Sequence, residues 1–319
     1  MIVLKFGGTS LESAEAIERM EFIVQSRLPR QPAVVVSALG KVTDGLLALG
    51  MDTAGGRWKE AAERFAWIRD YHFSVAEPLI RREDKLPLER FLEDHFSELQ
   101  DLLDRLQSTG KFTPQAQAAT TSFGERLSSR IVAMALRKSG LATAHFDSRM
   151  LVRTDDQHTQ AVPLLNETYS SVRNAIAPLQ KGVLPVLGGF IGSTSEGVTT
   201  TLGRNSSNLT AVLIAAALDA EEVEIWTDVD GVFEHDPRQV GDQHPIGELS
   251  FEDALEMAHR GAKVLHPGAV LLARQHGIPM WIRNSRRPGA PGTRVAGGRA
   301  LVGATAMNDG VRQPLASSD

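Results

Sequence analysis

Short apolar segments rich in β-branched residues alternate with longer amphipathic segments along the chain. Strands that are apolar on both faces are typical of a parallel sheet that helices cover on both sides. We predict strands at Ile2–Phe6, Ala33–Ser37, Ala144–Phe146, Val183–Leu187, Val223–Thr227 and Pro279–Arg283. The alternation of such strands with helices predicts an α/β fold with right-handed crossover connections.

Two stretches, one amphipathic and one apolar, predict helices. Leu92, Phe96, Leu99 and Leu106 recur at the spacing of one buried helical stripe, which predicts a long helix. A second helix is expected over the apolar run Leu209–Leu218. The polar bend at 192–197 is either a hairpin or the boundary between two lobes. The polar end of the chain, residues 308–319, lacks periodicity and is expected to fray.

Composition and charge exclude several classes of protein. The chain has 319 residues and a formal net charge of −5, which is too acidic for a broad nucleic-acid-binding surface. No apolar run approaches the roughly 18 residues of a membrane span, and the first residues read as a strand rather than a signal peptide. The absence of Cys excludes disulfides, thiol nucleophiles and Cys-based metal sites. These features favour a soluble cytoplasmic enzyme that binds neither membranes nor nucleic acids.

The first motif with chemical potential is Lys5-Phe-Gly-Gly-Thr-Ser10, directly after the first strand. Adjacent glycines let backbone N–H groups form an anion-binding concavity, and Lys5 adds a positive charge at the carboxyl end of the strand. Thr9 and Glu12 have capping-box spacing, which predicts a helix start here. The segment therefore suits a phosphate group, although it also fits an ordinary strand–turn–helix. It is not a Walker P-loop.

Two later loops could bind a substrate or nucleotide. In the loop 199–208, Arg204 offers a guanidinium fork for a carboxylate, and several hydroxyls could bind phosphate oxygens. Ser206 and Ser207 are equally explained as helix caps. The segment 226–238 contains several acids but does not match a calcium loop, because Trp226 occupies its first position. It fits a nucleotide base, ribose or phosphates better than a metal, and we predict no metal-ligating residues.

Two further segments each carry one charged candidate. Lys263 lies in Gly261-Ala-Lys-Val-Leu-His-Pro267, where it could serve a ligand or simply extend along apolar surface. His266 is expected to be a structural hydrogen-bonding group. Glu125, which we expect near a helix start, could bind a substrate ammonium or complement the helix dipole.

Taken together and in this order, these motifs closely resemble those of aspartokinases, over roughly residues 2–295. The matching segments are Lys5-Phe-Gly-Gly-Thr-Ser, Ser37-Ala-x3-Val-Thr43, Phe123-Gly-Glu-Arg-Leu-Ser, Gly189-Phe-Ile-Gly, Thr200-Thr-Leu-Gly-Arg, Trp226-Thr-Asp-Val-Asp-Gly-Val, Asp236-Pro-Arg, Gly261-Ala-Lys-Val-Leu-His-Pro and Asn284…Pro291-Gly-Thr293. The resemblance implies the amino acid kinase fold, a three-layer α/β/α sandwich with an open, mainly parallel central sheet. It implies one kinase domain over 1–307, with an acidic-substrate lobe to about 195 and a nucleotide lobe over about 196–307, followed by a polar tail at 308–319.

The family transfers the γ-phosphoryl group of ATP, with Mg, to the β-carboxylate of L-aspartate, giving 4-phospho-L-aspartate for the lysine, threonine and methionine pathways. By the resemblance, the catalytic residues are Lys5, Lys263 and Asn208. The substrate-binding residues are Ser37, Thr43, Glu125, Phe190, Arg204 and Ser207. The nucleotide-binding residues are Gly7, Gly8, Ser10, Thr227, Asp228, Phe233, Asp236, Arg238 and Lys263. A carboxylate is already a nucleophile, so the expected catalysis is positioning and charge neutralisation.

This sequence departs from the family at three positions. Asn208 stands where the family usually has Asp, Ser206 replaces a Gly, and Phe233 replaces a Tyr. Loss of the charge-assisted part of a hydrogen bond at 208 is worth about 1–2 kcal/mol, or on the order of tenfold in rate. Two alternatives therefore stay open: phosphotransfer to a related acidic amino acid, and a weakly active or regulatory amino-acid-binding homologue. Glu125 with Arg204 argues against a glutamate, carbamate or nucleotide acceptor.

Aspartokinases typically continue into ACT regulatory domains, whereas this sequence stops soon after the kinase core. Inhibition by lysine or threonine through such domains is therefore not expected. The expected binding partner is L-aspartate or a similar acidic amino acid. A homodimer stays open, because the interface that those domains usually supply is not in this sequence.

Overall fold

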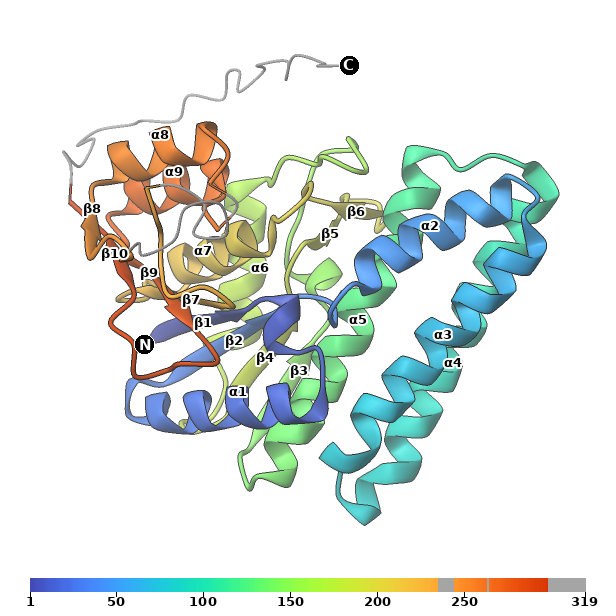
Figure 1. The fold of residues 1–319 in the computed structure, drawn as a ribbon, viewed down its shortest axis with the longest axis horizontal. Coiled ribbons are helices and arrows are strands. Elements are labelled where there is room, and N and C mark those ends of the chain that lie inside the picture. The colour runs from blue at the N-terminus through green and yellow to red at the C-terminus, as the bar shows by residue number, and fades with distance from the viewer. Residues whose placement is uncertain (235–243, 263, 298–319) are drawn as a thin grey trace.

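An eight-stranded sheet forms the centre of the computed structural model, which describes residues 1–234, 244–262 and 264–297. The strand order is β3-β4-β2-β1-β7-β9-β10-β8 (Figure 1). All neighbours are parallel except β9 and β10. The strands are β1 (Ile2–Phe6), β2 (Pro32–Val36), β3 (Thr143–Phe146), β4 (Leu184–Gly188), β7 (Val223–Thr227), β8 (Glu248–Leu249), β9 (Met280–Asn284) and β10 (Thr293–Val295). The expected open and mainly parallel sheet is confirmed.

Helices cover both faces of this sheet. The α-helices of the described residues are α1 (Ala14–Arg27), α2 (Val42–Ala54), α3 (Trp58–Ala76), α4 (Lys85–Thr109), α5 (Pro114–Lys138), α6 (Leu165–Ile176), α7 (Ser207–Ala217), α8 (Phe251–His259) and α9 (Pro267–His276). Alternate residues of β1 enter two different cores: Leu4 and Phe6 pack with α1 and α5, whereas Val3 packs with α6, α7 and α9. This division gives the three-layer α/β/α sandwich, with α1 and α5 on one side of the sheet in Figure 1 and α7 on the other.

All six predicted strands are present, each within one residue of its expected bounds. The polar bend at 192–197 is a hairpin, formed by β5 (Ile191–Ser193) and β6 (Thr199–Thr201) in a separate antiparallel sheet. The short strands β8 and β10 were not predicted from the sequence. Their pairing depends on contacts between distant segments, which local periodicity does not report.

The expected helix start after the first strand is wrong. Residues Gly8–Ser10 form a single 3-10 turn, and α1 begins only at Ala14. Its N-cap is Ser13, whose Oγ accepts a hydrogen bond from the N–H of Ala16. Ser10 is held elsewhere, because its Oγ lies 2.7 Å from the Oγ of Ser285 after β9. The chain therefore turns tightly over the end of β1 before the helix can begin.

The predicted long amphipathic helix is confirmed as α4, which pairs with α3 in a projecting helical hairpin (Figure 1). The buried side chains of α4 form one stripe, consisting of Leu88, Leu92, Phe96, Leu99, Leu103 and Leu106. The opposite face is exposed. None of the helices in the described part of the chain combines the length and the apolar character that crossing a bilayer requires.

We expect Leu99→Ala to lower the free energy of unfolding by about 2–5 kcal/mol, because it leaves a cavity at a position that is fully buried. Urea denaturation measures the change as a lower midpoint at an unchanged slope. Leu86→Ala on the same helix is the matched control, since Leu86 is 55% exposed. Equal effects at the two positions would show that α4 does not pack as described.

Candidate active site

The candidate active site lies at the carboxyl edge of the sheet, where β1, β2 and β7 end side by side. Lys5 is the penultimate residue of β1 and pairs in register with Val35 and Ile225 on the neighbouring strands. Its side chain is only 9% exposed. A Cβ built on Gly7 would lie 3.5 Å from the Lys5 Nζ, so the ammonium group rests against the glycine turn. Gly8 is equally confined, because a Cβ there would lie 3.1 Å from the backbone oxygen of Ala38.

Glu125 faces the same edge from α5. One carboxylate oxygen, Oε1, accepts a hydrogen bond of 3.0 Å from the N–H of Ala38. The other oxygen, Oε2, is buried and has no hydrogen-bond partner among the described residues. Glu125 lies in the middle of α5 and not near a helix start, which corrects the sequence-based expectation. The unpartnered oxygen therefore needs another donor, and the N-terminal helix dipole does not provide it.

Two glycines allow α5 to approach the strand ends closely enough to place this carboxylate. A Cβ on Gly124 would lie 2.7 Å from the Cβ of Ala38, and a Cβ on Gly188 would lie 2.8 Å from the Cβ of Glu125. Both distances are shorter than side chains tolerate. Larger residues would therefore push α5 away from β2 and β4.

Lys5 and Glu125 form an electrostatic pair in a dry environment. Burial lowers the pKa of Lys5 to about 8, and the negative charge of Glu125 works against that shift. Burial raises the pKa of Glu125 to about 8, against which the Ala38 N–H and the charge of Lys5 act. Each group thus favours the charged form of the other, although burial dominates both shifts. A ligand that brings its own positive group to Glu125 would restore the carboxylate.

The start of α7 closes the site from the second half of the chain. The loop before it bends sharply, with positive φ angles at Gly203 and Asn205. Ser207 packs directly on Gly189 at the end of β4, since a Cβ on Gly189 would lie 2.5 Å from the Ser207 Cβ. Phe190 has a φ of 64° and donates its N–H to the Thr210 Oγ1 at 3.0 Å. The predicted residues Phe190 and Ser207 are thereby brought to the end of β4.

Asn208 is buried in the first turn of α7, and its Nδ2 donates to the backbone oxygen of Val264 at 3.2 Å. Its Oδ1 has no hydrogen-bond partner among the described residues, and the same holds for the Oγ of Ser206. An Asp at this position could not donate to Val264. The predicted Lys263 lies outside the described residues, so its position relative to Asn208 is not part of the described geometry.

Arg204 lies at the surface, with its side chain 84% exposed, and pairs with Asp44 at 3.0 Å. Asp44 follows Thr43 in the first turn of α2, so the ion pair brings the loop before α7 close to that predicted substrate residue. Asp44 was not among the predicted site residues. Its only sequence signal is its position beside Thr43. Ser37 follows β2, and its backbone oxygen accepts from the Ser128 Oγ, another contact that the sequence did not predict.

The predicted nucleotide residues lie at the ends of β1 and β7. The Gly7 N–H donates to the backbone oxygen of Trp226, and Thr227 donates its hydroxyl to Asp228 at 3.1 Å. Ser10 is buried, and its hydroxyl is engaged with Ser285. Phe233 is partly buried in the loop that follows β7. Asp236 and Arg238 lie outside the described residues.

Among the described residues, no group of three or more His, Asp or Glu side chains is arranged to hold a metal ion.

Comparison with known proteins gives consistent results. The model of the amino acid kinase family matches residues 1–284. Aspartokinase 3 of Arabidopsis thaliana, a chloroplastic protein, is 34% identical over 94% of this chain and 53% of its own length. Lysine-sensitive aspartokinase 3 of Escherichia coli is 36% identical over 92% of this chain and 64% of its own length. The crystal structure of E. coli aspartokinase III in complex with aspartate and ADP superimposes with a TM-score of 0.86 at 34% identity, covering 94% of this chain and 65% of the other. The chain thus spans about half to two thirds of the length of these relatives.

We expect the free energy of unfolding of the wild type to fall, relative to that of Glu125→Gln, as the pH rises from 6.5 to 8. The pKa of Glu125 is raised on folding to about 8, so the folded state holds a proton that the unfolded state has lost, and stability decreases with pH in this window. The difference should reach about 1 kcal/mol. Urea denaturation at several pH values measures it.

The control is Glu98→Gln. The pKa of Glu98 is lowered, mainly by its hydrogen bond to Arg126 against the opposing effect of burial, so its contribution changes only at acidic pH. If the free energies of unfolding of the wild type and Glu125→Gln changed in parallel between pH 6.5 and 8, the raised pKa of Glu125 would be contradicted.

Proposed function

The chain belongs to the amino acid kinase family, and we propose that it transfers the γ-phosphoryl group of ATP to the β-carboxylate of L-aspartate, forming 4-phospho-L-aspartate. The observation that carries this proposal is the placement of a buried amine and a buried carboxyl group at one sheet edge. Lys5 lies against a glycine turn, and Glu125 keeps one buried oxygen without a partner among the described residues. The names of the relatives and the bound aspartate and ADP in the E. coli structure support the choice of substrates.

For the acceptor, we assign the α-ammonium group of aspartate to the Oε2 of Glu125. This contact would satisfy the orphaned oxygen and favour its charged form. Arg204 would bind a carboxylate of the substrate, exchanging its exposed ion pair with Asp44 for the ligand. Ser37, Thr43, Phe190 and Ser207 would line the remaining surface. An acceptor with both an ammonium and two carboxylates fits this set of groups.

For the phosphoryl donor, Lys5 and the turn of Gly7 and Gly8 would hold the γ-phosphoryl group. Lys263 would add a second positive charge, with Asn208 beside it. The nucleotide would lie over the end of β7, with Thr227, Asp228, Phe233, Asp236 and Arg238 around it and Ser10 supporting the turn. Mg²⁺ bound to the phosphates would neutralise part of their charge.

This division of roles places the acceptor in a lobe formed by residues up to about 195 and the nucleotide in a lobe over about 196–307. The sheet supports it, because β1 lies between β2 and β4 from the first part and β7 and β9 from the second. Residues 298–319 lie outside the described part.

The chemistry requires little beyond charge and position. A carboxylate oxygen of aspartate attacks the γ-phosphorus, a new P–O bond forms, and the bond to the β-phosphate oxygen breaks as ADP leaves. The acceptor is already ionised, so no general base has to remove a proton. The obstacle is the approach of an anion to a polyanion, and fixed ammonium groups in a dry site reduce it.

The direct test is ATP-dependent formation of an acyl phosphate, trapped with hydroxylamine as the hydroxamate. L-Aspartate should give product, and L-glutamate, which is longer by one methylene, should give much less. Calorimetric binding of each amino acid with a nonhydrolysable nucleotide separates binding from turnover. Tight aspartate binding without any hydroxamate would instead support an amino-acid-binding homologue.

We expect Lys5→Met to reduce kcat by about 10²–10³-fold, because it removes a preorganised positive charge from the transferring phosphoryl group. The hydroxamate assay measures the loss. Lys59→Met is the matched control, since the Lys59 side chain is 85% exposed on α3. Full activity of Lys5→Met would refute the role of Lys5 and, with it, the proposed site.

We expect Asn208→Asp to lower stability by about 1–2 kcal/mol, because a carboxylate cannot donate to the backbone oxygen of Val264. The same change should raise kcat by up to about tenfold, because it introduces a negative charge near the proposed phosphate-binding lysines. Asn205→Asp, in the exposed part of the same loop, is the control and should change neither quantity appreciably. Lower stability with unchanged or reduced kcat would assign Asn208 a structural role only.

A further inference from the structure

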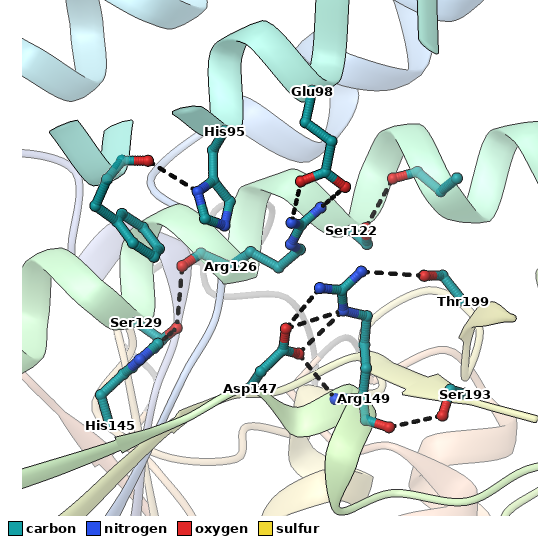
Figure 2. A network of polar contacts seen from close by, with 12 residues as sticks. His95, Glu98, Ser122, Arg126, Ser129, His145, Asp147, Arg149, Ser193 and Thr199 are labelled. Atoms are coloured by element: carbon teal, nitrogen blue, oxygen red, sulfur yellow. Dashed lines mark hydrogen bonds and ion pairs between the residues drawn. The ribbon is translucent and has the colours of Figure 1, made fainter. Parts of the chain in front are cut away.

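A second cavity opens at the carboxyl ends of β3 and β4, outside the proposed phosphotransfer site. Its volume is about 370 Å³, and α4, α5 and the segment after β3 enclose it. The polar residues that matter here are His95, Arg126, Ser129, His145, Asp147 and Arg149. Figure 2 shows these side chains converging from three different parts of the chain. None of them was predicted as a site residue.

A thin wall separates this cavity from Glu125. Gly188 lines the cavity, and its Cα lies so close to Glu125 that a Cβ there would come within 2.8 Å of the Glu125 Cβ. Arg126 follows Glu125 in α5 and points to the cavity side, where it binds Glu98 of α4 through both terminal nitrogens. Successive residues of one helix therefore serve two separate sites.

Two ion pairs bring guanidinium groups to this cavity. Arg126 pairs with Glu98, and Arg149 pairs with Asp147. A third guanidinium, that of Arg130, does not line the cavity but lies over the ring of Phe91, which does, and it is near enough to lower the pKa of His145. Burial is the main cause of that shift, and the pKa of His95 is also lowered, so both rings are neutral at pH 7 and add no charge. The cations that line the cavity are therefore Arg126 and Arg149, and Arg130 adds positive charge beside Phe91, opposed by Asp84.

Buried polar atoms in and beside this cavity lack partners. Arg126 is only 7% exposed, and its Nε is buried without a hydrogen-bond acceptor among the described residues. The Nε of Arg130, which lies over the Phe91 ring outside the cavity lining, also has no partner among the described residues. An unpaired guanidinium N–H in a buried position is costly, and an acceptor supplied by a ligand would remove that cost.

The cavity also has an apolar wall. The Phe91 ring lies on the His95 ring with a centroid separation of 3.9 Å, and Ile191 also lines the cavity. At about 370 Å³ the space is larger than an inorganic anion requires and falls in the range of small-molecule sites.

We propose that this cavity binds a small organic anion, whose carboxylate or phosphate group contacts Arg126 and Arg149 and whose apolar part lies on Phe91. A purely structural ion-pair network is the competing interpretation. It accounts for the pairing of Glu98 and Asp147, but it does not account for the unpaired guanidinium N–H groups or for the open volume.

The test uses phenyl phosphate and benzoate as probes, with benzyl alcohol as the uncharged counterpart, in calorimetric titrations of the whole chain at neutral pH. Saturating ADP and aspartate are present, so that the probes cannot report on the phosphotransfer site. At least one anion should bind and benzyl alcohol should not. The stronger of the two anions identifies a phosphate-type or a carboxylate-type ligand.

Two variants with opposite expected effects separate binding from structure. Arg149→Gln should weaken binding of the anion by about tenfold or more, because a charged hydrogen-bond donor is lost. Asp147→Asn should tighten binding of the anion several-fold, because it removes the carboxylate that competes for the Arg149 guanidinium. The amide oxygen of Asn can still accept the hydrogen bond from the backbone N–H of Arg149. Arg153→Gln is the matched control, since Arg153 bonds Ser193 and does not line the cavity.

No binding of either anion at millimolar concentrations would overturn the proposal, as would equal affinities in the wild type and Arg149→Gln. Weaker binding in Asp147→Asn would assign the network a structural role. If Arg149→Gln does not yield folded protein, Ser129→Ala and Arg149→Lys allow the same comparison.

Discussion

The structure depends on one constraint, which is that an amine and a carboxyl group are both held in a dry position at the carboxyl edge of a parallel sheet. Lys5 and Glu125 come from the first strand and from the middle of a long helix. Burial works against the charge of both, and each partly compensates the other. The glycines around them are a consequence, because only backbone without side chains lets α5 and the β1 turn approach closely enough. A site of this kind is poised for a ligand that carries both signs of charge.

Much of the fold could be predicted because its strands are buried on both faces and therefore appear as unbroken apolar runs. β1 and β7 have the predicted bounds, and the stripe of α4 reports its buried face directly. The sequence of the polar bend does not distinguish the hairpin β5–β6 from a boundary between two lobes, since a polar bend is compatible with both. The strands β8 and β10 are too short to have a period, and their pairing is decided by tertiary contacts.

The candidate site was predictable in its residue types more than in its geometry. The glycine turn after β1 and the resemblance at Glu125 pointed to the sheet edge at which the structure buries Lys5 and Glu125. The position of Glu125 within α5 did not follow from its sequence, because a helix of 25 residues gives no local sign of which residue meets a strand end. Similarly, the motif around Thr9 had the spacing of a cap, yet Ser13 caps α1, since the buried contact between Ser10 and Ser285 holds the preceding turn. The pairing of Arg204 with Asp44 joins residues 160 positions apart and has no sequence signature.

The same helix explains why a second charged cavity exists beside the first site. Residues next to each other on a helix point about 100° apart. Once Glu125 is directed at the end of β2, Arg126 has to face the neighbouring strands β3 and β4, where a guanidinium needs acceptors. Glu98 of α4 accepts hydrogen bonds from both terminal nitrogens of Arg126, which fixes the α3–α4 hairpin against α5. The Nε of Arg126 has no acceptor among the described residues. The geometry that serves the first site therefore creates an unsatisfied positive group at the second, and an anion is the chemical species that completes it.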